Sequence, residues 1–156
     1  MDQLNRREFV AAVACAACLC GLGSTANLLA DDSTAAPSTL DAGPKSDYSA
    51  DGITPTWMPA PNKVAIIRHE GKIYACTSVC THHGVTINEA DDKDSFICPK
   101  HHSRFNIDGI VTRGPARKPL KRYAISVDAN GHIIVDKSTS FDKDQWDDPK
   151  SFVKVG

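Results

Sequence analysis

Apolar and polar residues alternate in short runs between positions 62 and 137, and turn residues separate these runs. Alternation over four to eight residues predicts half-buried strands. Gly71, Asp108-Gly109 and Asn130-Gly131 stand between neighbouring runs, which is typical of antiparallel hairpins. Outside the first thirty residues no window keeps a helical period over ten positions, so the pattern predicts an all-β domain over 62–137. The predicted strands are Val64–Arg68, Lys72–Thr77, a short strand ending at Pro99, Phe105–Ile107, Ile110–Thr112, Ala124–Val127 and Ile133–Val135.

The segments on either side of this region carry weaker patterns. Asp31–Asp47 is built from Asp, Ser, Thr, Ala, Pro and Gly with a single Leu and a single Lys, so we expect it to be a flexible linker. The lead-in up to residue 61 is rich in proline and turn residues. The pattern assigns no element to the tail over 138–156, which has three aromatic residues available for packing, Phe141, Trp146 and Phe152.

The first thirty residues have the layout of an export signal. Arg6 and Arg7 precede Phe9, and an uncharged, Ala-rich run continues to Gly23. The arginine pair resembles a twin-arginine signal, which predicts a protein that is periplasmic or attached to the outer face of the cytoplasmic membrane. The pattern leaves open whether the segment is cleaved or retained as an N-terminal membrane anchor.

Composition and charge narrow the functional classes. The 156 residues suit a single domain, and a net charge of −1 argues against a nucleic-acid binder. The charge is uneven, because seven basic residues and one acidic residue lie between Ser95 and Ile125. Two interpretations stay open: a surface that steers an acidic redox partner, or a solvated surface paired with Glu89, Asp91, Asp92 and Asp94.

Cysteine and histidine gather in two short stretches, "CTHHGV" from Cys80 and "CPKHHSRF" from Cys98. Cys80-x-His82 and Cys98-x-x-His101 would each offer one thiolate and one imidazole from a turn-rich loop. Two ligands from each of two loops predict a small inorganic centre held between hairpin tips. Thiolate with imidazole suits either zinc or iron–sulfur chemistry, so a structural zinc module is one alternative.

The two motifs, Cys-Thr-His-x-Gly and Cys-Pro-x-His-x-Ser, resemble the signature of Rieske [2Fe–2S] proteins, and the likeness covers roughly residues 60 to 136. The resemblance implies an all-β, Rieske-like antiparallel domain with a cluster-binding subdomain formed by two loops at hairpin tips. It also implies a [2Fe–2S] cluster in which Cys80 and Cys98 hold one iron, and His82 and His101 hold the other. On this reading, the adjacent His83 and His102 are solvated neighbours.

The chain departs from the high-potential members of the family at several positions. Val85 and Lys100 stand where those relatives have a disulfide, so the resemblance implies loops held by packing and hydrogen bonds alone. Ser103 keeps a hydroxyl that donates to the cluster, whereas Phe105 lacks the hydroxyl of the usual tyrosine, and Pro115 completes the expected surroundings of the cluster. Because this chain keeps one of the two hydroxyl donors, the resemblance implies an intermediate reduction potential. A further cysteine, Cys76, is expected to be a small core residue.

The resemblance implies an electron-transfer protein or subunit whose partner is a cytochrome or an oxidoreductase subunit. Oxygenase activity would need a separate mononuclear iron domain, for which this chain is too short. The narrower alternatives are the iron–sulfur subunit of a quinol–cytochrome c oxidoreductase, with quinol as donor, and the small subunit of a periplasmic oxidoreductase such as arsenite oxidase. A degenerate domain without metal is a further alternative.

Overall fold

The computed structural model describes residues 38–155, and the expected export signal or anchor therefore lies outside the described residues. The described residues belong to one compact unit, which spans 34–156. Its only helices are three short 3-10 turns, η1 (Lys45–Tyr48), η2 (Pro55–Trp57) and η3 (Lys143–Gln145). Over the described range, no helix has the length and apolar character needed to cross a membrane.

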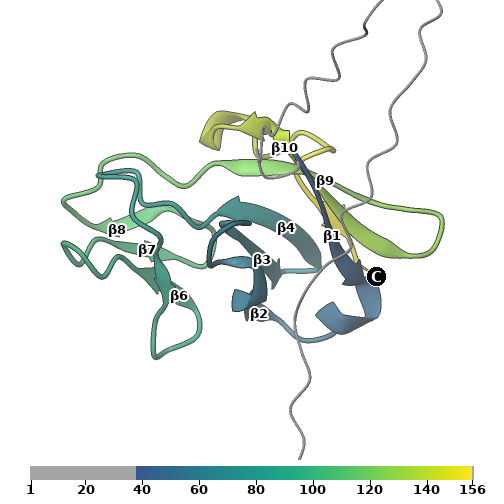
Figure 1. The fold of residues 1–156 in the computed structure, drawn as a ribbon, viewed down its shortest axis with the longest axis horizontal. Helices are drawn as coiled ribbons and strands as arrows, with labels where there is room; N and C mark the ends of the chain where they lie inside the picture. The colour runs from purple at the N-terminus through teal and green to yellow at the C-terminus, as the bar shows by residue number, and fades with distance from the viewer. Residues whose placement is uncertain (1–37, 156) are drawn as a thin grey trace, which may run out of the picture. The chain divides into compact units, whose positions relative to one another are not determined.

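The larger of the two sheets has seven strands and is antiparallel throughout (Figure 1). Its strands run in the order β1-β10-β9-β4-β3-β2, and β11 pairs with β4 beyond this path. The bounds of these strands are β1 Thr39–Pro44, β2 Gly52–Thr54, β3 Val64–His69, β4 Lys72–Thr77, β9 Arg122–Val127, β10 His132–Phe141 and β11 Val153–Lys154.

A smaller antiparallel sheet holds the segment between β4 and β9, in the order β5-β6-β7-β8. Its strands are β5 Asn88–Glu89, β6 Ser95–Ile97, β7 Arg104–Asn106 and β8 Val111–Arg113. Strands β6, β7 and β8 lie together at one end of the domain, and β1 and the β9–β10 hairpin lie toward the other (Figure 1). Both cysteine–histidine stretches belong to loops of this smaller unit. The prediction of an all-β domain of antiparallel hairpins, with the two cysteine loops at hairpin tips, is confirmed.

The core lies on both faces of the central strands, because successive side chains of a strand point to opposite faces. On β3, Val64 and Ile66 face one apolar cluster, and Ala65 and Ile67 face another. The second cluster extends into the smaller sheet, so one apolar core joins the two sheets. Its fully buried members include Tyr74, Cys76, Ile87, Phe96, Phe105 and Leu120.

The prediction of a flexible linker over Asp31–Asp47 is wrong for residues 39–44, because they form the edge strand β1, which pairs with β10. The low apolar content concealed an alternation, since Leu40 and Ala42 are buried and their neighbours Thr39 and Asp41 are exposed. Two small apolar contacts suffice here because β10 already offers an unpaired edge to complete. The part of the expected linker before residue 38 lies outside the described residues.

The C-terminal tail packs onto the domain, although its sequence assigned it no element. Strand β10 extends to Phe141, past the predicted end at Val135, with a register shift between Asp136 and Ser140. Phe141 is 8% exposed, and Phe152 packs against the cluster shared with the smaller sheet. The ring of Trp146 lies 4.3 Å from the guanidinium of Arg122, and thereby covers a buried charge.

Candidate metal centre

The two cysteine loops, 80–85 and 98–103, share one backbone hydrogen-bond pattern. In each loop the cysteine carbonyl accepts from the N–H four residues later, and the cysteine N–H donates to the carbonyl five residues later. The loops therefore present their cysteine and histidine side chains from equivalent turns, although the two motifs differ in spacing. The four bonds are Gly84 N–H to Cys80 O (2.9 Å), Cys80 N–H to Val85 O (2.8 Å), His102 N–H to Cys98 O (2.9 Å) and Cys98 N–H to Ser103 O (2.9 Å).

Both loops stand at the tips of antiparallel pairs. Val79 and Thr86 form an antiparallel bridge at the base of the first loop, and β6 and β7 pair on either side of the second. Each loop reverses direction through a left-handed residue, Gly84 with φ +68° and His102 with φ +56°. Glycine adopts this conformation without strain, whereas a histidine does so at a cost.

The two thiols lie in the interior. Cys80 and Cys98 are each 2% exposed, and both belong to the apolar cluster that contains Phe96 and Phe105. Both are free thiols, as is the fully buried Cys76, which faces inward from β4 as expected. Burial raises the pKa of Cys76 to about 12, so this residue is an inert core side chain and not a ligand candidate.

Three imidazoles converge outside the thiols. The ring centroids of His82 and His101 lie 5.0 Å apart, as expected for side chains that share one centre. His83 joins them, with its ring 3.8 Å from that of His82 and 5.2 Å from that of His101. One nitrogen from each of these three rings lies within 4.8 Å of the others. The sequence analysis expected His83 to be a solvated neighbour of the ligands. The spacing of the motif does not indicate that its ring lies close to those of His82 and His101.

One imidazole nitrogen in this group is in the state that a metal requires. The Nδ1 atom of His82 is buried and has no hydrogen-bond partner in the structure. A buried polar atom without a partner is costly unless a ligand satisfies it. Burial, followed by the nearby His83, His101 and Lys100, lowers the pKa of His82 and favours the neutral ring that binds metals. The donor set, two buried thiols and adjacent imidazoles, therefore fits a cluster with mixed sulfur and nitrogen ligation.

A third loop, residues 114–120, connects the two cysteine loops. Ser103 Oγ accepts a hydrogen bond of 3.0 Å from the Ala116 N–H, and Thr81 Oγ1 donates one of 2.7 Å to the Lys118 carbonyl. The third loop thus binds one residue of each cysteine loop. Among the described residues, these two hydrogen bonds help to hold the cysteine loops together, as the resemblance implied for a chain without the disulfide. Sequence reasoning missed Thr81, although it lies inside the motif.

The residues expected to tune the cluster lie at this junction. Ser103 is fully buried, and its hydroxyl uses only its acceptor capacity within the described residues, which leaves its proton free to donate. Phe105 is fully buried on β7, opposite Phe96 on β6. Pro115 is exposed, and with His82 it lines a hollow of about 390 Å³.

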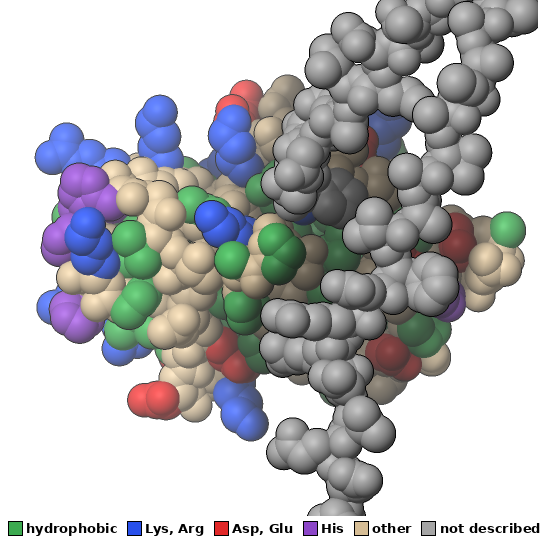
Figure 2. Space-filling model, in the orientation of Figure 1, with side chains coloured by type: hydrophobic (Ala, Val, Ile, Leu, Met, Phe, Trp, Pro, Cys, Tyr) green, Lys and Arg blue, Asp and Glu red, His purple; other side chains and the backbone are tan. Residues whose placement is uncertain are grey.

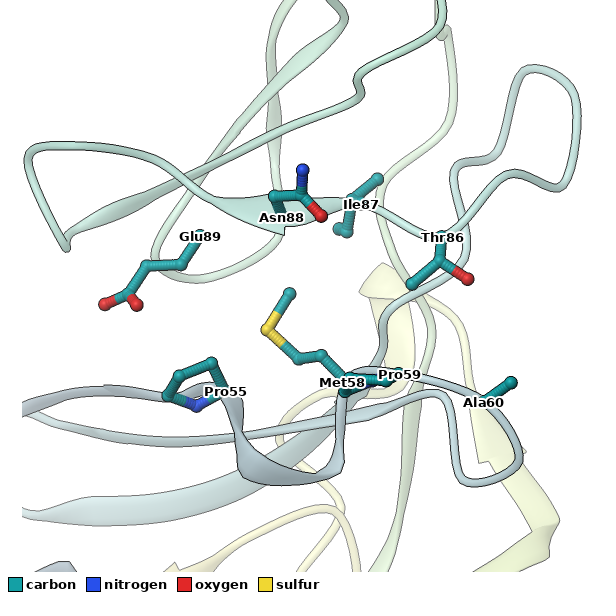
Figure 3. A pocket seen from close by; sticks show the side chains of 8 residues that line it. All are labelled: Pro55, Met58, Pro59, Ala60, Thr86, Ile87, Asn88 and Glu89. Carbon is teal, nitrogen blue, oxygen red and sulfur yellow. The ribbon is translucent and has the colours of Figure 1, made fainter.

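A second hollow has a volume of about 400 Å³, and its lining shares no residue with that of the first hollow. The side chain of Met58 projects into it from the turn after η2, toward the segment that carries Asn88 and Glu89 (Figure 3). Its lining contains no cysteine or histidine, so it is not part of the candidate centre. The lining residues are Pro55, Met58, Pro59, Ala60, Thr86, Ile87, Asn88 and Glu89.

Comparison with known proteins identifies a family for this architecture. The sequence profile of the Rieske [2Fe-2S] domain matches residues 39–124, which is more than half of the chain. The cytochrome b6-f complex iron-sulfur subunit of Chlorobaculum tepidum is 31% identical over 62% of this chain and 52% of its own length. Subunit 1 of the same name from Synechocystis is 35% identical over 49% of this chain and 44% of its own length.

The chain spans about half the length of these curated relatives. Among solved structures, a cyanobacterial plasma membrane Rieske protein from Synechocystis is 29% identical, with a TM-score of 0.48 over 62% of this chain and 97% of that chain.

Proposed function

Because this chain belongs to the Rieske [2Fe-2S] domain family, we propose that it is an exported electron-transfer protein or subunit that passes single electrons to or from a redox partner. Its cofactor is a Rieske [2Fe–2S] cluster. When bound, this cluster supplies a one-electron couple, with one iron on two thiolates and the other on two imidazoles. The observation that carries the proposal is the buried, unpartnered Nδ1 of His82 beside a second imidazole, at the end of a core that holds two free thiols.

We assign Cys80 and Cys98 to one iron, and His82 and His101 to the other. The equivalent hydrogen-bond patterns of the two loops support this pairing, because each loop then contributes one thiolate and one imidazole. His83 is exposed and follows His82 directly in the same loop. We place it beside the ligands, where its ring covers that of His82 and helps to exclude water from the site.

Different residues of the chain have different roles in the proposed electron transfer. The buried thiols keep one side of the centre in the apolar core, and the exposed edge of His101 offers the partner a short path for the electron. With the cluster bound, the Ser103 hydroxyl would donate a hydrogen bond to it and would thereby stabilise the more negative, reduced state. The third loop holds Ser103 and Thr81 in place, so that little reorganisation accompanies the change of charge.

The relatives narrow the class of partner. The curated proteins with the similarity reported above are named as iron-sulfur subunits of cytochrome b6-f complexes. Their names support a cytochrome complex as the partner. We further propose quinol as the electron donor, and delivery of the folded domain to the outer face of the membrane by the twin-arginine-like segment. The small subunit of a periplasmic oxidoreductase such as arsenite oxidase remains the alternative assembly.

The test is a redox titration of the purified full-length protein under anaerobic conditions. We expect two iron and two sulfide per chain, a red-brown colour that bleaches on reduction, and an electron-spin signal that accounts for one electron per cluster. Reduction by a quinol analogue in the presence of a cytochrome complex would support the quinol assignment. A colourless protein that binds one zinc per chain would contradict the proposal.

A further inference from the structure

The end of the domain that carries the histidines also carries an unusual concentration of positive charge. Figure 2 shows a group of His side chains at one end of the molecule, with Lys and Arg side chains around it. We define the basic rim as Lys100, Arg113, Arg117 and Lys118, all of which are exposed.

The rim is adjacent to the candidate ligands by sequence and by structure. Lys100 lies between Cys98 and His101 in the second loop. Arg117 and Lys118 line the same hollow as His82. Arg113 ends β8, immediately before the third loop.

The rim charges are not neutralised within the domain. Over residues 38–155, the ion pairs shorter than 4.0 Å involve none of the four rim residues. Asp108 is the one acidic residue between Ser95 and Ile125, and it is occupied by Arg122 at 3.5 Å. The acidic residues Glu89, Asp91 and Asp92 line a separate hollow with Arg104. Over residues 38–155, the sequence-based alternative, in which the whole basic stretch pairs with this acidic group, is therefore not observed: Arg104 lies beside the group, and none of the ion pairs includes it.

One feature of the rim lowers the stability of the fold. Arg113 on β8 stands directly opposite Arg104 on β7 in the antiparallel register. Like charges directly opposite each other on neighbouring strands are destabilising. A charge arrangement that costs stability and has no internal partner is expected where an external partner of opposite charge binds.

We propose that the basic rim is the docking surface for an acidic face of the redox partner protein, which brings the partner's redox group against the exposed His82/His101 edge. This inference rests on the proposed function and adds the chemistry of the partner. With a net charge of −1 on the whole chain, the rim makes one end positive and leaves the remainder acidic. A partner with an acidic face is therefore attracted to the correct end and repelled from the wrong ones.

The experiment measures electron transfer from the reduced, cluster-loaded full chain to cytochrome c as ionic strength increases from about 10 mM to about 500 mM, a range over which screening becomes strong. Two forms of the same cytochrome are the probes: the native basic protein, and the protein with succinylated lysines, which has an acidic surface. Binding to each immobilised probe by surface plasmon resonance provides a readout that is independent of electron transfer. The variants are Arg117→Glu/Lys118→Glu in the rim and Lys45→Glu/Lys137→Glu on the β1–β10 side of the large sheet.

The two double variants change the net charge equally, so a difference between them reports position and not total charge. For the acidic probe we expect fast transfer that slows as salt rises, and a rim variant slower by about tenfold or more at low salt, with weaker binding. The control should keep the salt dependence of the wild type, and the electron-spin signal should be unchanged in both.

Equal salt dependence in the rim and control variants would overturn the proposal. So would salt-independent transfer to both probes combined with rim-dependent binding to vesicles of anionic phospholipid, because the rim would then be a membrane-contact surface. A protein without a cluster would refute the proposed function, yet the binding measurement would still decide the role of the rim.

Discussion

Gly84 and His102 hold the same position in the two cysteine loops. Each donates its N–H to the carbonyl of the cysteine four residues earlier, and each has a left-handed backbone, at φ +68° and φ +56°. Since glycine is free to adopt this conformation and histidine is not, the second loop carries strain that the first lacks.

His102→Gly should therefore keep the loop and relieve this strain. The relief is about 1 kcal/mol, part of which is lost because glycine has more conformational freedom in the unfolded chain. We expect the free energy of unfolding of the cluster-loaded protein to stay the same or to rise by up to about 1 kcal/mol, measured by denaturant titration. Gly84→Ala is the converse change, because it places a side chain at a left-handed position, and it should destabilise the fold by about 1 kcal/mol. The added Cβ would meet no atom within 4 Å, so this cost comes from the backbone conformation alone. A large loss of stability in His102→Gly would show that the ring itself is structural.

Ser103→Ala should lower the reduction potential, because it removes a donor that stabilises the reduced cluster. A loss of about 1 kcal/mol in that preference corresponds to about 40 mV for a one-electron couple. Protein-film voltammetry gives the potential. Ser78→Ala is the matched control, since Ser78 is also fully buried and donates to a backbone carbonyl, that of Met58. It should destabilise the fold and leave the potential unchanged.

The same account predicts that Phe105→Tyr raises the potential by adding a hydroxyl donor near a ligand sulfur. Phe105 is fully buried in the core cluster that also contains Cys98, so the new hydroxyl must find a partner there. A lower potential with an intact cluster would mean that this side chain does not face the sulfurs.

The pairing of β1 with β10 should depend on pH through Asp41 and His132. The Gly43 N–H and then His132 lower the pKa of Asp41, and the hydrogen bond that His132 Nδ1 donates to Asp41 raises the pKa of His132. The Asp41 contribution is present above its unfolded pKa of about 3.9 and is lost as pH falls through its folded value. The His132 contribution is complete below its unfolded pKa of about 6.5 and is lost as pH rises through its folded value.

The pair therefore stabilises the edge strand between about pH 4 and pH 6.5. The coupling energy in a double-mutant cycle of Asp41→Asn and His132→Gln, followed by thermal melts, should be largest in this window and fade toward pH 9. A coupling that is constant across the whole range would contradict the assignment.

Arg6→Lys with Arg7→Lys should hold the folded, coloured protein in the cytoplasm, if export depends on the arginine pair. Cell fractionation followed by immunoblotting measures the outcome. Lys45→Arg, with its charge conserved in the described domain, is the control and should be exported normally. Normal export of the double variant would rule out the twin-arginine route.

Local patterns in the sequence were sufficient for most of the sheet and for the motif. Alternation and turn residues predicted Lys72–Thr77 at its observed bounds, and placed five of the six other predicted strands within two residues. The short strands β2, β5 and β11 were not predicted. The strand Thr39–Pro44 escaped because its stability comes from β10, about ninety residues away, and not from its own apolar content. The packing of the C-terminal tail was not predicted for a similar reason, since Trp146 is ordered by stacking on Arg122.

The arrangement around the candidate centre depended on contacts that no local pattern encodes. The bond between Thr81 and Lys118 joins residues 37 positions apart, and the bond between Ser103 and Ala116 joins residues 13 apart. The approach of His83 to His101 also arises only when the two loops meet. The motif could name the donor types, but only the folded chain shows that three imidazoles converge.

The convergence of three imidazoles makes the choice of histidine ligands the central question. Nitrogen hyperfine spectroscopy of the reduced cluster, in the wild type and in the single alanine variants of His82, His83, His101 and His102, addresses it directly. We predict two coordinated imidazole nitrogens in the wild type, and the same two in His83→Ala and His102→Ala. The characteristic signal should be lost in His82→Ala and in His101→Ala. Loss of the signal in His83→Ala, with two coordinated nitrogens retained in His82→Ala, would contradict the account.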